Sequence, residues 1–168
     1  MSLGMYNATV PMFKTLLGAL AKNLDKAAAL AIAKNIDPLV LTSARLAPDM
    51  LPLSRQVQIA SDGVRGGLAR LAGLDMPVME DTEKTIDELK ARIAKTIAYL
   101  DSFTPAQIDG SEGREVVLKM RSGEMKFTGQ NYLFQFVIPN FTFHCTTAYN
   151  ILRHNGVEIG KRDFLGAA

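Results

Sequence analysis

The chain has 168 residues, the length of a single domain, and 48% of the residues are apolar while 21% are charged. This composition excludes an intrinsically disordered chain, whose apolar content is too low to offset the entropy of ordering. The 19 basic and 17 acidic residues are mixed along the sequence, so there is no basic stripe for nucleic acid. We therefore expect one globular domain over 1–168 that does not bind nucleic acid.

Three features of the sequence concern its location. No segment has the roughly 18 consecutive apolar residues that a membrane-spanning helix needs. The first residues lack the basic and apolar regions of a secretion signal. The only cysteine, Cys145, rules out an internal disulfide and suits a reducing compartment. We expect a cytoplasmic protein without a membrane partner.

The N-terminal segment has the periodicity of an amphipathic helix. Apolar residues recur at every third or fourth position from Tyr6 to Leu24. Pro11 lies inside this pattern and indicates either a kink or a later helix start. Asp25 is placed to cap a separate alanine-rich helical stretch over 26–34. The sequence therefore predicts a helix followed by a second, capped helical segment.

Two further helices are expected in the middle of the chain. One covers 50–73, where Gly63 and Gly67 share a face, a pattern that favours close helix packing over a ligand contact. The other has a regular apolar stripe that ends at Leu100, and Asp81 or Thr82 is its expected N-cap.

Charged side chains on these helices are expected to face solvent. Glu88 and Arg92 are four residues apart, the spacing of an ion pair on the outer face of a helix. Arg55, Asp62 and Arg65 form either a polar rim over a pocket or an ordinary exposed face. We favour the exposed face for both sets.

The C-terminal third of the chain changes character. The segment 114–128 has β-favouring residues on both sides of a glycine turn and predicts a small hairpin. A fourth helix is expected over 130–155, bent at Pro139 and ended by Asn155 and Gly156. The elements together predict an all-α four-helix bundle with a β-hairpin inserted between helices three and four.

His144 is the candidate functional residue, because its position in the apolar stripe of the fourth helix points it inward. Asn140 lies one helical turn earlier, and Gln56 meets both residues if the second helix packs on the fourth. One imidazole and two amides can orient a small polar ligand by hydrogen bonds. The alternative is a core histidine whose hydrogen bonds are satisfied within the protein. The apolar walls of such a site would be Val57, Phe134, Val137 and Phe141.

The other chemically active side chains give weaker signals. A single imidazole with amides is a poor ligand set for a transition metal, so we expect neither a metal nor another cofactor. Cys145 follows His144 directly and points about 100° away from it, which is typical of a small buried apolar residue. His154 lies beside the predicted helix end, where it caps the helix dipole.

Several motifs resemble a bacterial family of domains of unknown function related to the DinB/YfiT-like four-helix proteins. The motifs are Arg45-Leu46-Ala47-Pro48-Asp49-Met50, Arg55-Gln56-Val57, Ala69-Arg70-Leu71-Ala72-Gly73, Glu83-x-Thr85, Pro139-Asn140-Phe141-x-Phe143-His144-x-Thr146-Thr147-Ala148-Tyr149, Leu152-Arg153-His154-Asn155-Gly156-Val157 and Gly160-Lys161-Arg162-Asp163-Phe164. The final segment is quite specific. The resemblance covers nearly the whole chain. It implies an up-down-down-up bundle and a homodimer.

Many proteins of that superfamily bind a divalent metal through three histidines, and some are thiol-dependent transferases or isomerases. In this sequence only His144 matches a metal-binding position, while Ala148 and Gln56 occupy the other two. We therefore expect a superfamily member that binds a small molecule in the bundle interior without a metal. The alternatives are a thiol- or metal-dependent enzyme of the superfamily and an interaction protein acting through a dimer face. Whether the chain is an enzyme stays open.

Overall fold

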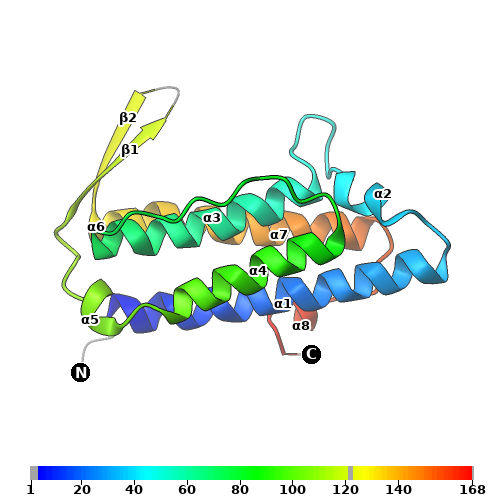
Figure 1. Ribbon diagram of the computed structural model, residues 1–168, viewed down its shortest axis with the longest axis horizontal. Coiled ribbons are helices and arrows are strands. Elements are labelled where there is room, and N and C mark those ends of the chain that lie inside the picture. Colours follow the sequence, from blue (N-terminus) through cyan, green and yellow to red (C-terminus); the bar gives the residue numbers. More distant parts are fainter. Residues whose placement is uncertain (1–3, 121–122, 168) are drawn as a thin grey trace.

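A computed structural model describes residues 4–120 and 123–167 as a bundle of long helices in up-down-down-up order (Figure 1). This confirms the predicted fold class. The bundle consists of α1 (Met5–Ala33), α3 (Leu53–Ala72), α4 (Ile86–Asp101) and a last helical segment that ends with α7 (Ile138–His154). One continuous apolar core lies between them and includes the fully buried side chains Phe13, Leu17, Leu68, Phe141 and Ile151. None of the described helices is both long and apolar enough to cross a bilayer.

Helix α1 is one uninterrupted helix, so the predicted break at Asp25 is wrong. The alanine-rich residues after Asp25 continue the helix. The carboxylate of Asp25 forms an ion pair with Lys90 on α4 at 2.5 Å. Pro11 is accommodated inside α1, which begins six residues before it. The chain then turns through Asn35, which has a left-handed backbone with φ of 50°, into the short helix α2 (Pro38–Ser43). The sequence pattern did not indicate α2.

Helix α3 forms as predicted and packs most extensively on α7. It ends at Gly73, whose φ of 71° suits glycine in the left-handed region. A Cβ on Gly67 would lie 2.8 Å from Val137, and one on Gly63 would lie 3.4 Å from the side chain of Asn140. The two glycines therefore allow α3 and the last helical segment to approach closely, which confirms that they serve packing.

Residues 74–85 form an irregular strap that runs back along the bundle from the end of α3 to the start of α4 (Figure 1). The N-cap of α4 is Thr85, whose hydroxyl accepts from the backbone N–H of Glu88, while Glu88 accepts from the backbone of Thr85. The predicted N-caps Asp81 and Thr82 are therefore wrong. They belong to the strap, because buried arginines bind this segment before a helix can start.

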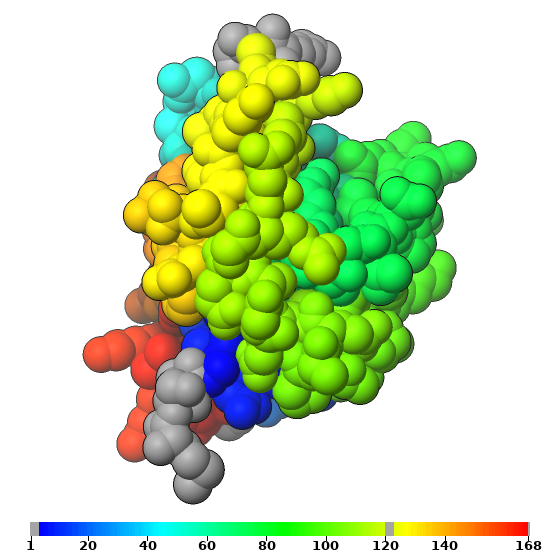
Figure 2. Space-filling view, turned by 90° about the vertical axis from the view of Figure 1, so that its left-hand side faces the viewer, coloured from blue at the N-terminus to red at the C-terminus, as the bar shows by residue number. Residues whose placement is uncertain are grey.

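The predicted hairpin is present. After the short helix α5 (Pro105–Ile108), β1 (Glu115–Met120) pairs antiparallel with β2 (Gly123–Thr128). Figure 2 looks along the bundle at this end and shows the hairpin standing above the helices. Its base rests on the bundle through Phe127, whose ring lies 5.8 Å from that of Tyr132. This packing gives the two strands the apolar contacts that an isolated hairpin lacks and without which it is only marginally stable in water.

The last long helix changes its hydrogen-bond register before Pro139. It starts as α6 (Gly129–Asn131), continues as a π-helical segment η1 (Tyr132–Val137) and becomes the α-helix α7. Because Pro139 has no N–H to donate, the ordinary helical hydrogen bond at this point is missing, and the wider π turn takes its place. The changed register leaves Phe134 43% exposed, so it is not a wall of the interior as predicted. Asn155 and Gly156 end α7 as expected, and the short helix α8 (Lys161–Phe164) follows.

Candidate functional site

The structure brings His144 on α7 against Gln56 on α3, as the sequence predicts for packed helices two and four. Nδ1 of His144 lies 2.7 Å from Oε1 of Gln56. Nε2 of Gln56 donates to the backbone carbonyl of Leu51 at 2.9 Å. His144 retains 9% of its surface accessible and Gln56 2%. The pair therefore lies at the edge of the contact between α3 and α7, the α3–α7 seam, and protein covers most of its surface.

These two contacts decide which nitrogen of His144 carries the proton. The carbonyl of Leu51 can only accept, so the amide of Gln56 must turn its NH₂ group toward Leu51 and its oxygen toward His144. The oxygen of Gln56 can also only accept, so Nδ1 of His144 carries the hydrogen. In the neutral ring, Nε2 then holds a lone pair, and no hydrogen-bond partner for it occurs among the residues described.

Burial lowers the pKa of the His144 imidazole below its ordinary value of 6.5. As the pH falls, the unfolded chain therefore takes up a proton at this residue before the folded chain does, and the folded state loses stability from about pH 6.5 downward. We expect His144→Gln to flatten the fall in melting temperature between about pH 7.5 and 5.5. Equal slopes for His144→Gln and the parent would contradict this assignment.

Asn140 is half-buried one turn before His144, with its amide nitrogen 3.4 Å from the position of a Cβ on Gly63. Among the described residues, no hydrogen bond joins Asn140 to Gln56 or His144. The structure therefore unites two of the three predicted site residues and places the third beside them. Phe143, which is 55% exposed, sets its ring edge-on to His144 at 5.3 Å between ring centres.

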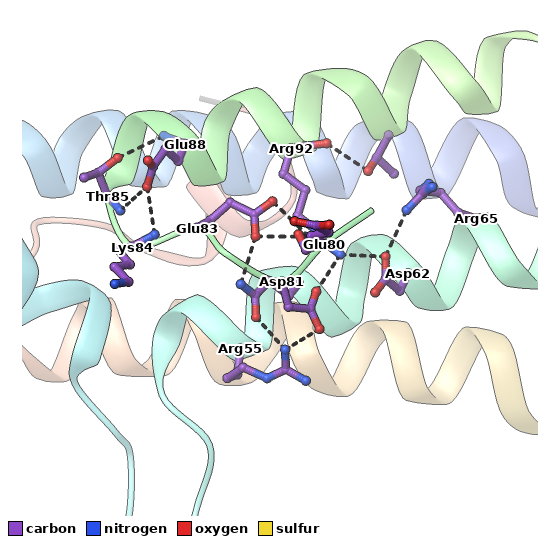
Figure 3. A network of polar contacts seen from close by, with 12 residues as sticks. Arg55, Asp62, Arg65, Glu80, Asp81, Glu83, Lys84, Thr85, Glu88 and Arg92 are labelled. Carbon is purple, nitrogen blue, oxygen red and sulfur yellow. Dashed lines mark hydrogen bonds and ion pairs between the residues drawn. The ribbon is translucent and has the colours of Figure 1, made fainter. Parts of the chain in front are cut away.

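A second polar cluster ties the strap to the bundle, and Arg92 on α4 is its centre (Figure 3). Its side chain is fully buried and its guanidinium binds Asp62 at 2.7 Å, Asp81 at 2.9 Å and Glu83 at 2.9 Å. Burial alone would lower the pKa of Arg92, but hydrogen bonding to Glu83 and the charge of Asp62 outweigh it and raise the pKa. Arg92 therefore stays charged inside the protein.

Two more arginines of α3 extend this cluster. Arg65 binds Asp62 at 3.0 Å and the backbone carbonyl of Pro77 in the strap, and Arg55 binds Asp81 at 2.5 Å. Burial and the neighbouring charge of Arg92 lower the pKa of Arg65. The prediction of solvated charged faces is thus wrong for Arg65 and Arg92, because the strap covers the groove that they line. Glu88 caps α4 and does not pair with Arg92.

Five clefts on the molecule are lined by residues other than His144, Gln56 and Asn140. One of about 500 Å³ lies beside the strap and includes Arg65, Lys95 and Tyr99. Another of about 600 Å³ lies at the opposite end of the strap, around Ile32 and Leu39. The Gln56–His144 pair is therefore a polar contact between α3 and α7 with little accessible surface, and it lines none of these five clefts.

Comparison with known proteins identifies the family. The family model described as "Domain of unknown function (DUF1993)" matches residues 5–165. The chain belongs to the DUF1993 family. It is also similar to the crystal structure of a DinB family member from Shewanella denitrificans, with 42% identity, a TM-score of 0.89, and coverage of 98% of this chain and 93% of that one. No curated protein matches.

The three-histidine metal site of DinB-like proteins does not fit the residues of this DUF1993 chain. The oxygen of Gln56 is hydrogen-bonded to His144, and Ala148, where a second histidine would stand on α7, is fully buried and offers no donor atom. Within the described part of the chain, no three His, Cys, Asp or Glu side chains gather in a metal-binding arrangement. The residues at this position therefore do not supply the ligands of such a metal site.

Cys145 has the environment that the sequence predicts for it. Its side chain is buried, and burial raises the pKa of the thiol to about 12. At neutral pH it is therefore protonated and a poor nucleophile.

Proposed function

We propose that this DinB-like protein binds a small molecule at the α3–α7 seam, with Nε2 of His144 as the hydrogen-bond acceptor for the ligand. The observation that carries the proposal is the contact between Gln56 and His144, which assigns the proton to Nδ1 and leaves a lone pair on Nε2. This lone pair has no partner among the described residues, and Nε2 is not one of the fully buried unpartnered atoms, so water or a ligand can donate to it.

The surroundings indicate the kind of ligand. Phe143 and Leu51, which are 55% and 43% exposed, offer apolar surface near the pair. The amide of Asn140 adds a carbonyl acceptor and an NH₂ donor group a turn away along α7. Such a ligand carries an N–H or O–H group for His144 and an apolar part for Phe143. The predicted walls Val57, Val137 and Phe141 are fully buried and support the pair from within the core.

A thermal-shift screen of metabolites tests this proposal. We expect at least one ligand that raises the melting temperature of the parent to lose this effect in His144→Gln and to keep it in His154→Gln, a histidine variant at an exposed position of the same helix. Gln56→Met should weaken the binding of the same ligands about tenfold. The imidazole remains in this variant, but no acceptor fixes its proton on Nδ1. Retention of every stabilising ligand in His144→Gln would remove the site from consideration.

An enzymatic role is the second candidate, and the same lone pair favours it. A neutral imidazole with a free Nε2 can accept a proton from a bound substrate as a general base. A thiol mechanism would need an external thiol, because the thiol of Cys145 is buried and protonated. Turnover of a ligand found in the screen, lost in His144→Gln, would favour this role over simple binding.

A further inference from the structure

A cleft of about 600 Å³ lies where the C-terminal end of α1, helix α2 and the N-terminal end of α4 meet, separate from the His144 site. This volume lies within the range of small-molecule sites. Its walls are mostly apolar. They are formed by Ala28, Ile32, Pro38, Leu39 and Ile86, and the polar rim consists of Asp37, Lys84, Thr85 and Asp87.

Two apolar side chains in this cleft face water. Ile32 is 81% exposed and Leu39 is 52% exposed, whereas Ile86, which lines the same cleft, is buried. Burying such side chains is worth about 25 cal/mol for each Å² removed from water. An apolar molecule in the cleft would gain this energy from both residues at once.

Hydrogen bonds among polar groups hold the cleft open and leave its apolar walls free. The turn after α1 is fixed by the left-handed Asn35 and by a bond from the N–H of Ile36 to the carbonyl of Ala31 at 2.9 Å. Asp37 caps α2 through the N–H of Leu39 at 2.9 Å. The hydroxyl of Thr42 on α2 donates to the carbonyl of Lys84 at 2.8 Å, which joins α2 to the strap. The cleft is therefore preformed, which lowers the entropy that a ligand loses on binding.

The charges at the rim indicate the polarity of the ligand. Two carboxylates, Asp37 and Asp87, and one amine, Lys84, line the cleft, which leaves one negative charge in excess. Just outside, Lys90 is paired with Asp25 at 2.5 Å, and this pair adds no net charge. An anionic group would meet two carboxylates, whereas a protonated amine would complement them.

We propose that this cleft is a second binding site, whose ligand is a small apolar cation. Its hydrocarbon or aromatic part lies on Ile32 and Leu39, and its protonated amine lies at the rim with Asp37 and Asp87. The proposal does not depend on His144, because no residue is shared between the two sites.

Three naphthalene probes of matched size test the proposal: 1-naphthylmethylamine, 1-naphthylmethanol and 1-naphthoate, which are cationic, neutral and anionic at neutral pH. The chain has no tryptophan, so naphthalene fluorescence reports binding without interference from indole emission. We expect saturable binding of the amine that is about threefold tighter than that of the alcohol, and weakest binding of the naphthoate. Tightest binding of the naphthoate, or saturable binding of none of the three, would overturn the proposal.

Surface variants locate the binding and leave the fold intact. Ile32→Ser should weaken the binding of all three probes about fivefold, because it removes an exposed apolar side chain from the wall of the cleft. Asp87→Asn should remove most of the preference for the amine and leave the alcohol unchanged. Val78→Ser is the matched control, since Val78 is 88% exposed but lines the cleft beside Arg65. Equal effects of Ile32→Ser and Val78→Ser would place the probes elsewhere and overturn the proposal.

Discussion

Replacing Arg92 with methionine is expected to lower the stability of the protein by about 3 kcal/mol, because it leaves three carboxylates without their shared cation. The side chain of Arg92 is fully buried, while Asp62 and Asp81 keep about a third of their side-chain surface in water. This remaining hydration reduces the cost relative to a fully buried set of charges. At about 2–4 °C per kcal/mol, we expect a fall in melting temperature of about 6–12 °C in a thermal unfolding experiment.

Arg55→Met is the matched control for this variant. Arg55 binds the same carboxylate of Asp81, but 38% of its side chain is exposed, so its loss should cost less than about 1 kcal/mol. Limited proteolysis adds a second readout, since Arg92→Met should expose the strap to cleavage before the helices. Melting temperatures that fall equally in the two variants would show that burial does not distinguish the arginines and would contradict this account of the cluster.

Gly129→Ala is the second variant with a large expected effect. Gly129 starts α6 directly after the hairpin, and a Cβ there would lie 2.0 Å from the backbone carbonyl oxygen of Ser111. A backbone atom cannot turn aside as the end of a side chain can, so the junction between the hairpin and the bundle must shift. We expect a loss of about 3 kcal/mol in the free energy of unfolding, measured by chemical denaturation.

Gly18→Ala separates this clash from the general effect of adding a methyl group. Gly18 lies inside α1, and apart from its chain neighbours and the adjacent helix backbone no atom lies within 4 Å of its Cβ position. Alanine should therefore stabilise the helix by about 0.5–1 kcal/mol. If Gly129→Ala were as stable as the parent, the tight contact with Ser111 would not exist as described.

The long elements could be predicted because their signals are local. Periodic apolar residues in α3, α4 and α7, and the glycine turn of the hairpin, determine those elements from within each segment. The π-helical segment could not be predicted in this way, because it has more residues per turn than the α-helix that the apolar spacing assumes. The prediction that Phe134 points inward used the α-helical spacing and was therefore wrong. The break at Asp25 was wrong because a capping residue does not end a helix whose following residues favour it.

The buried arginine cluster shows more clearly what the spacing of residues along a helix does not predict. The spacing of Glu88 and Arg92 is the same for a solvated ion pair and for a capping residue next to a buried cation. Only the path of the strap decides between them, and that path depends on contacts between residues far apart in sequence. One local signal was available, since three acidic residues, Glu80, Asp81 and Glu83, stand together before α4.

The candidate site was partly predictable for a similar reason. The stripe of α7 placed His144 inward, and the glycines of α3 indicated which helix packs against it. The direction of the Gln56 amide was not predictable, because it depends on the carbonyl of Leu51 in the preceding loop. This contact determines the tautomer of His144, and the proposed function depends on the tautomer.

The protonation of His144 is the most direct test of the proposed function. Long-range ¹H–¹⁵N correlation spectra of the ¹⁵N-labelled protein distinguish a protonated from an unprotonated ring nitrogen, and His144→Gln assigns the signals. At neutral pH we expect a neutral ring with hydrogen on Nδ1 and a lone pair on Nε2, and a pKa below 6.5 on titration. Hydrogen on Nε2 in the neutral ring, or a charged ring at neutral pH, would contradict the proposed acceptor role.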